Sequence, residues 1–450
     1  MLGILRNRTY RHLFAAQILS VLGTGLMSVA LALLAYDLAG ENAGIVLGTA
    51  LAIKMVAYVG VGFLAGAFAG RLPRRGLLVA LDVVRACVVL ALPFVDAIWQ
   101  VYVLIALLQS ASAIFTPAFQ ATIPDILSDE RDYTRALSLS RLAMDLENLA
   151  SPVLAAVLVA LFGYSWLFAG TSLGFVASAL LVLAAVLLKA AMGDKPGSVA
   201  KRMTRGAAIY LKTPRLRGLL ALNLSVAAAG AMVIVNTVVV VRAGYGLGEA
   251  DVAIAFAVFG GGSMLAALAL PRLLERRGDR AVMVSAAACA SLLLCTVAAS
   301  FGLRGSAFSW TWFLAALALL GFFYSAVQVP TGRLLRRSAH AEDRPAIFSA
   351  QFALSHACWL VTYPLAGWLG ATAGMPATLA VLGIVAGSGA AAAALLWRKD
   401  EEDDIRHAHP DLPPHHPHLK DHGAGASHVH VYVIDDLHRH WPAAKRPWTG

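Results

Sequence analysis

The sequence reads GAFAGRLPRRG at residues 66–76 and LPRLLERRG at residues 270–278. Each stretch is a short basic turn that follows a long apolar segment, and the two stand at matching places in the two halves of the chain. Basic turns between long apolar segments are typical of loops on the cytoplasmic side of a membrane. The repeat predicts a helical membrane protein built from two parallel halves.

Composition supports a membrane-embedded chain. Of the 450 residues, 59% are hydrophobic and 14% are charged, and the mean hydropathy is +0.71. The apolar blocks are long enough to cross a hydrocarbon layer of ~30 Å as helices, whereas a β-barrel would give short alternating segments. We therefore predict an all-α membrane protein with twelve transmembrane helices. They are expected to begin near residues 13, 45, 76, 98, 140, 165, 218, 251, 281, 309, 348 and 375.

The placement of charge predicts the orientation. The net charge is +10, and the basic residues gather in alternate loops, whereas the other loops carry few Lys or Arg apart from Arg242 and Arg304. This asymmetry places both termini in the cytoplasm and argues against a nucleic-acid partner. The basic N-terminus lacks a small-residue cleavage site close behind it, so the first segment is expected to remain as an uncleaved helix.

A basic connector and a polar tail divide the chain. We predict an N-terminal six-helix bundle at 1–189, a cytoplasmic connector at 190–217, a C-terminal six-helix bundle at 218–397 and a His-rich cytoplasmic tail at 398–450. The first part of the tail has too little apolar content to fold alone. Residues 429–434 alternate between apolar and polar and predict a short strand.

The first basic turn resembles the signature of the major facilitator superfamily between its second and third helices. The matching residues are Gly66, Ala69, Arg71, Arg74 and Arg75. Gly70 replaces the acidic residue of that pattern and Pro73 replaces a glycine, which leaves a gating salt bridge without its carboxylate. Asp82 and Arg85, one turn apart on the third helix, are candidates to supply it. Alternatively, the arginines only set the topology.

Histidines dominate the tail. Ten of the 13 in the chain fall there: His407, His409, His415, His416, His418, His422, His428, His430, His438 and His440. Neutral imidazole is a suitable ligand for Ni, Co, Cu and Zn, and carboxylates lie between the histidines. The composition therefore predicts a metal-binding tail. The alternatives are weak chelation without a role in transport, or a merely solvated tail. The four cysteines lie within predicted spans and suggest neither a disulfide framework nor a zinc knuckle.

Placing an ionisable side chain within a membrane costs free energy, so the ionisable residues within the spans are candidates for the transport site. The fifth span carries Asp145, Glu147 and Asn148, and the eleventh carries His356 and Cys358. Residues two apart point ~200° apart on a helix, so at most one of each pair can reach a shared ion. The alternative for the acidic pair is an internal salt bridge, with Arg141 or with Lys54 of the second span. His356 could equally be a packing residue, and Cys358 a small hydrophobe.

Further motifs narrow the resemblance. The stretches FTP at 115–117, IPD at 123–125 and NLASP at 148–152 resemble the exporter group that contains bacterial enterobactin and macrolide efflux proteins. The stretch SHACWL at 355–360 and the His-rich tail resemble NreB-type nickel-resistance exporters. That resemblance implies export of Ni²⁺, with Co²⁺ as the second candidate ion, across a bacterial inner membrane in exchange for protons, which confers metal resistance.

The remaining expectations concern partners. No Walker-type loop is present, so we expect no ATP, and no hydrolase or zincin motif is present, so we expect no enzyme activity. We expect no cofactor, Ni²⁺ or Co²⁺ as substrate, protons and the lipid bilayer as partners, and a monomer. The alternative is an exporter of a drug, macrolide or siderophore-like organic molecule with a metal-binding accessory tail. A membrane metal sensor that transports nothing is a second rival.

Overall fold

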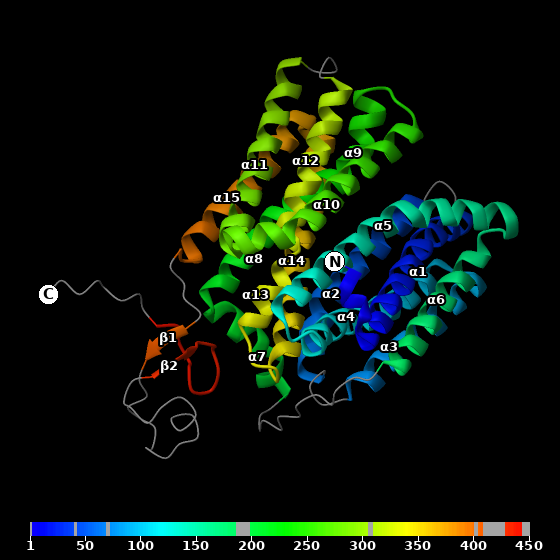
Figure 1. Cartoon of the computed structure of the whole chain (residues 1–450). Coiled ribbons are helices and arrows are strands. Elements are labelled where there is room, and N and C mark those ends of the chain that lie inside the picture. Colours follow the sequence, from blue (N-terminus) through cyan, green and yellow to red (C-terminus); the bar gives the residue numbers. More distant parts are fainter. Residues whose placement is uncertain are drawn as a thin grey trace.

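The computed structural model describes residues 2–39, 43–68, 73–185, 199–304, 309–399, 404–407 and 428–442. Helices dominate them, and Figure 1 shows two bundles joined through the middle of the chain. The N-terminal bundle contains α1 (Arg8–Ala39), α2 (Ala43–Phe68), α3 (Arg74–Ala91), α4 (Ile98–Ile126), α5 (Glu130–Phe162) and α6 (Ser165–Ala184).

The C-terminal bundle repeats this order. Its first span is α8 (Pro214–Ala231), continued by η4 (Met232–Asn236), α9 (Thr237–Val239) and η5 (Val240–Gly244). The others are α10 (Glu249–Arg277), α11 (Asp279–Arg304), α12 (Trp310–Gln328) with α13 (Thr331–Arg337), α14 (Arg344–Thr372) and α15 (Gly374–Leu396). Short 3₁₀ turns η1 (Leu2–Arg6) and η3 (Leu92–Phe94) and helix α7 (Val199–Lys212) complete the helical part.

The internal repeat is visible in the packing. In the first bundle α1 packs on α6, α3 on α6, α2 on α4 and α3 on α4. In the second bundle α8 packs on α15, α11 on α15, α10 on α12 and α11 on α12. The pairs correspond one to one, so the two halves have the same helix arrangement. The two bundles meet mainly through α2 with α14 and α5 with α10, which are also corresponding pairs.

Lipid-facing and interior-facing helices differ in composition. Nine helices of the described part are long and apolar enough to cross a membrane, and α2 adds a shorter apolar stretch at Thr49–Gly62. Helices α5 and α14 are not among the nine, because they carry the polar and charged residues of the interface between the bundles. Large apolar side chains such as Leu180, Leu265 and Leu395 are 60%, 64% and 84% exposed, as expected on a surface that lipid covers.

The fifth helix begins earlier than its hydropathy suggests. We expect a span from about residue 140, and α5 begins at Glu130. Asp129 caps the helix by accepting a hydrogen bond from the backbone N–H of Asp132 at 2.9 Å. The first six residues are mostly polar, ERDYTR, so they extend the helix beyond its apolar part.

Close helix approaches depend on glycine at the centre of the C-terminal bundle. A Cβ at Gly262 of α10 would collide with the Ala318 carbonyl of α12, and a Cβ at Gly321 of α12 would collide with the Phe259 carbonyl of α10. The two glycines therefore let the backbones of α10 and α12 touch, as small residues do in membrane bundles.

One end of the bundles carries most of the charged contacts, and we call it the gate end. It contains the N-terminus of α3, the turn from α4 to α5, helix α13 and the start of α14. The first residues of the chain also lie there, since Ile4 belongs to the same buried apolar cluster as Leu127 and Tyr133. The bundles touch at the gate end and diverge toward the opposite end, and the tail lies beside the gate end (Figure 1).

The described part of the tail forms a small two-stranded sheet. Strand β1 (Asp404–His407) pairs antiparallel with β2 (His428–Val431), with Asp404 opposite Val431 and His407 opposite His428. The strand predicted at 429–434 thus begins one residue earlier and ends at Val431. Tyr432, Val433 and Ile434 follow it and are 6%, 5% and 3% exposed.

Candidate functional site

A carboxylate of α4 joins the two bundles at the gate end. Asp125 forms ion pairs with Arg74 of its own bundle and with Arg344, the first residue of α14 in the other bundle. Arg74 is one of the signature arginines, so Asp125 supplies the acidic partner that Gly70 does not. Arg75 donates instead to the Leu183 carbonyl, and Arg71 lies outside the described residues.

A second charged cluster joins the start of α5 to α13 and to the start of α11. Glu130 of α5 contacts Arg333 at 2.8 Å and Arg337 at 2.5 Å, and both arginines also approach Asp279, the first residue of α11, at 3.4 and 3.3 Å. Arg333 is 9% exposed and also donates to Thr134 at 3.0 Å. Asp279 is likewise buried, whereas Glu130 and Arg337 are 40% and 35% exposed. The two clusters therefore hold the bundles together at the gate end.

Asp82 and Arg85 lie elsewhere. Arg85 contacts Asp82 at 2.9 Å and Ser20 at 3.1 Å, and Ser178 donates to Asp82 at 2.7 Å. These contacts join α3, α1 and α6 within the N-terminal bundle, where Asp82 is fully buried. The pair therefore joins helices within one bundle, whereas Asp125 pairs with arginines of both bundles.

The N-terminal bundle encloses a cavity of about 510 Å³. Two cationic side chains line it, Lys54 of α2 and Arg85 of α3, and its lining contains no carboxylate among the described residues. Arg85 also stacks over Phe175, with its guanidinium carbon 3.9 Å from the ring centroid. The other polar lining residues include Gln17, Thr24, Ser28, Gln109, Thr116 and Gln120.

Asp145 of α5 is held by a cation of its own helix. Arg141 contacts its carboxylate at 2.6 and 3.3 Å, and Asp145 is 1% exposed. Arg141 also donates to Ser263 of α10 at 2.9 Å and lies 5.0 Å from the Tyr324 ring of α12. The salt bridge considered from the sequence is therefore formed with Arg141. The side chains of Glu147 and Asn148 lie outside the described residues.

His356 of α14 lies at the contact between α14 and α2. Its Nδ1 lies 2.7 Å from the Phe352 carbonyl, and its ring packs edge-on against Tyr58 of α2 at 4.7 Å. Lys54 lies over the same Tyr58 ring at 5.5 Å. Cys358 donates to the Leu354 carbonyl of its own helix at 3.5 Å. Asp145 therefore lies where α5 meets α10, and His356 where α14 meets α2, so the structure does not bring them together.

The tail gathers imidazoles at the gate end. His428 and His430 stack with ring centroids 5.3 Å apart, and the His438 ring lies 5.1 Å from that of His430. Within the described residues no group of three His, Cys, Asp or Glu is arranged to hold a metal ion. His440 is exposed on the same segment. The side chain of His407 and all of His409, His415, His416, His418 and His422 lie outside the described residues.

Solved structures with the same arrangement of helices are membrane transporters. The human organic anion transporter MFSD10 (TETRAN) superposes with a TM-score of 0.72 at 13% identity, over 86% of this chain and 99% of that one. A bacterial homologue of the iron transporter ferroportin, in an outward-facing state, gives 0.69 at 13% identity, over 86% and 98%. At these identities the likeness concerns the fold.

Sequence comparison identifies the family. No curated protein sequence matches the chain. The family model of the Major Facilitator Superfamily matches residues 13–239 and 219–417, which together cover most of the sequence. The chain is a multi-pass membrane transporter rather than an enzyme, and it belongs to the Major Facilitator Superfamily.

Proposed function

We propose that the chain exports a divalent transition metal, Ni²⁺ or Co²⁺, from the bacterial cytoplasm across the inner membrane in exchange for protons. The observation that carries the proposal is the cluster of imidazoles from the tail beside the gate end. Imidazole is the preferred ligand of these ions, and a ligand-rich tail at the entrance serves capture of the cargo. In this proposal the gate end faces the cytoplasm, as the placement of basic loops predicts.

The candidate ligands within the membrane fit a cycle of alternating access. Arg141 neutralises Asp145 while it also contacts Ser263 of the other bundle. His356 packs on Tyr58 of the other bundle. Both candidate ligands are thus held through contacts that cross between the bundles. Rocking of the bundles would break those contacts and expose the carboxylate and the imidazole to the cytoplasm.

The structure then corresponds to the state after release. With the gate end closed, Arg141 provides the positive charge beside Asp145 that the metal would provide in the loaded state. Metal ligation needs the deprotonated carboxylate and the neutral imidazole, so protonation from outside would weaken binding. Arg141 and protons together would displace the ion and prevent its return.

A second candidate function is favoured by one observation. The cavity of the N-terminal bundle is lined by Lys54 and Arg85 and by no described carboxylate. Arg85 is paired with Asp82, so Lys54 supplies the positive charge that suits an organic anion better than a bare cation. In this alternative the chain exports an organic molecule of the drug, macrolide or siderophore kind, and the tail only binds metal. The human neighbour described as an organic anion transporter has the same fold.

Transport into inverted membrane vesicles with an acidic lumen separates the two candidates. For metal export, we expect radiolabelled Ni²⁺ to accumulate when the proton gradient is present and at least tenfold less when it is collapsed. Asp145→Asn should abolish accumulation, whereas Lys54→Gln should retain it. For the organic-anion function, a fluorescent organic anion should accumulate instead, and Lys54→Gln should abolish its transport. Absence of Ni²⁺ accumulation in vesicles that transport the dye would refute metal export.

A further inference from the structure

The end of the tail packs against the C-terminal bundle at the gate end. We call residues 428–442 the docked segment. Tyr432 and Ile434 belong to the same buried apolar cluster as Ile209 of α7 and Leu216 of α8. Trp441 of the segment lies 5.7 Å from the guanidinium of Arg215. Apolar burial and a cation–π contact therefore fix the docked segment on the surface made by α7 and α8.

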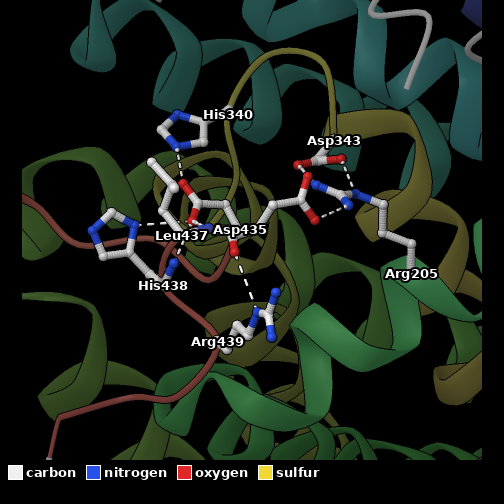
Figure 2. A network of polar contacts seen from close by, with 8 residues as sticks. Arg205, His340, Asp343, Asp435, Leu437, His438 and Arg439 are labelled. Atoms are coloured by element: carbon white, nitrogen blue, oxygen red, sulfur yellow. Dashed lines mark hydrogen bonds and ion pairs between the residues drawn. The ribbon is translucent and has the colours of Figure 1, made fainter. Parts of the chain in front are cut away.

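Asp435 is the centre of the polar contacts (Figure 2). One of its oxygens accepts hydrogen bonds from the backbone N–H groups of Leu437 and His438, at 2.8 and 2.6 Å, and lies 2.9 Å from Nδ1 of His438. The other lies 3.4 Å from Nε2 of His340, in the turn between α13 and α14. The hydrogen bond to Asp435 raises the pKa of His340. The docked segment thus holds the turn through a carboxylate–imidazole contact.

A second contact reaches the same turn through α7. Arg205 donates one hydrogen bond to Asp436 at 3.0 Å and two to Asp343, at 2.6 and 3.0 Å. A planar guanidinium that binds one carboxylate with two N–H groups fixes its orientation. Asp343 directly precedes Arg344, the partner of Asp125 across the gate. The docked segment and α7 therefore hold both sides of the turn.

The turn at residues 338–343 connects the two sets of gate arginines. Helix α13, which carries Arg333 and ends at Arg337, precedes the turn, and Arg344 begins the helix after it. Helix α7 also packs closely on α14: the two backbones are so near that a Cβ at Gly206 would collide with the carbonyl of Ala346. Restraining the turn and α7 therefore restrains the arginines that close the gate end.

The docked arrangement opposes chelation by the same histidines. The rings of His428 and His430 are nearly parallel, with an interplanar angle of 12°. Nitrogen lone pairs lie in the ring plane, so two stacked rings cannot both point at one ion at the ~2.0–2.1 Å that imidazole ligands require. His438 directs Nδ1 at Asp435. That contact leaves Nε2 of His438 available as a ligand, but the side chains of His428 and His438 are only 4% and 3% exposed while the segment is docked. A metal that binds these imidazoles together must therefore turn the rings and uncover the two buried side chains.

We propose that the docked segment is a metal-released latch on the gate. Docked, it stabilises the closed gate end through His340, Asp343 and Arg205. Chelation of a transition metal by His428, His430 and His438 competes with docking, because a ligand that binds the undocked form more tightly shifts the equilibrium toward it. Undocking frees the turn, so the gate opens when metal is present in the cytoplasm. This inference rests on the proposed orientation and metal substrate.

Amide hydrogen exchange on the full-length protein in nanodiscs tests the latch. We expect Ni²⁺ to accelerate exchange at residues 428–442 and at 338–343 together by at least tenfold, and Mg²⁺ to have no effect. Asp435→Ala should accelerate exchange in both segments without metal and leave little further response. Arg406→Gln, an exposed change on β1, is the matched control and should respond as the unmodified chain does. Slower exchange with Ni²⁺, or no change, would overturn the proposal.

Two further variants separate the latch from the other tail histidines and from transport. His428→Gln with His430→Gln should abolish the Ni²⁺ response, whereas changing the five histidines between 409 and 422 to Gln should preserve it. The opposite pattern would overturn the proposal. Because exchange needs no transport, a preserved response in a protein that moves no Ni²⁺ would refute the proposed function and leave a metal-responsive latch.

Discussion

Reversing the charge of Arg333 is expected to open the gate end and abolish transport. In Arg333→Glu a third carboxylate would lie beside Glu130 and Asp279, where the arginine now contacts both at 2.8 and 3.4 Å. The contact that crosses between the bundles is the one with Glu130, which is 40% exposed, and a hydrogen bond between charged groups contributes about 1.5–3 kcal/mol. A change of that size shifts a two-state equilibrium by a factor of about 10–100.

The shift can be measured as a distance between spin labels on the exposed residues Gly76 and Arg276, one from each bundle, after replacement of the four native cysteines. We expect a longer distance in Arg333→Glu, and a smaller increase in Arg333→Gln, which removes the cation without adding a carboxylate. The matched control is Arg131→Gln. It breaks a pair with Glu275 that also joins the bundles, but its partners are 74% and 50% exposed. An unchanged distance in Arg333→Glu would contradict the assigned gate.

Neutralising Asp145 is expected to affect both stability and transport. Asp145→Asn leaves Arg141 as a buried cation without its carboxylate, which should lower the free energy of unfolding by about 3–5 kcal/mol. Ni²⁺ flux should fall at least tenfold beyond the loss of folded protein. Asp132→Asn is the matched control on the same helix, because its pair with Arg135 is 41% and 44% exposed and such pairs contribute about 0–1 kcal/mol.

A double variant separates the structural role of Asp145 from its role in transport. Arg141→Leu with Asp145→Leu removes both charges, so thermal stability should recover while Ni²⁺ flux stays absent. Recovery of flux together with stability would show that the pair only supports the fold. Asp145 would then not be a ligand, and the organic-anion function would be favoured.

The fold could be predicted from the sequence because its signals are local and repeated. Long apolar blocks and the two basic turns at 66–76 and 270–278 give the helices and the two halves. The start of α5 could not be predicted in this way, because the polar residues after Asp129 belong to the helix but lie outside the apolar span. The pair Arg141 and Asp145 was also foreseeable, since residues four apart share a helix face.

The gate could not be predicted from such patterns. Asp125 and Arg344 are 219 residues apart, and Arg333 and Thr134 are 199 apart. Asp125 had one local signal, its place in the stretch IPD, which says nothing of its partner. Likewise, His356 packs against Tyr58 of α2, which is remote from it in the sequence. Strand β1 follows an acidic stretch and forms because β2 pairs with it. These features depend on contacts between remote segments.

The most direct test of metal/proton exchange uses the purified full-length protein in liposomes that contain a pH-sensitive dye, with the membrane potential clamped. Metal/proton antiport predicts that external Ni²⁺ raises the luminal pH as protons leave and Ni²⁺ enters. Co²⁺ should do the same, Mg²⁺ should not, and Asp145→Asn should abolish the change. A luminal pH that does not respond to Ni²⁺ but responds to an organic anion would contradict metal export.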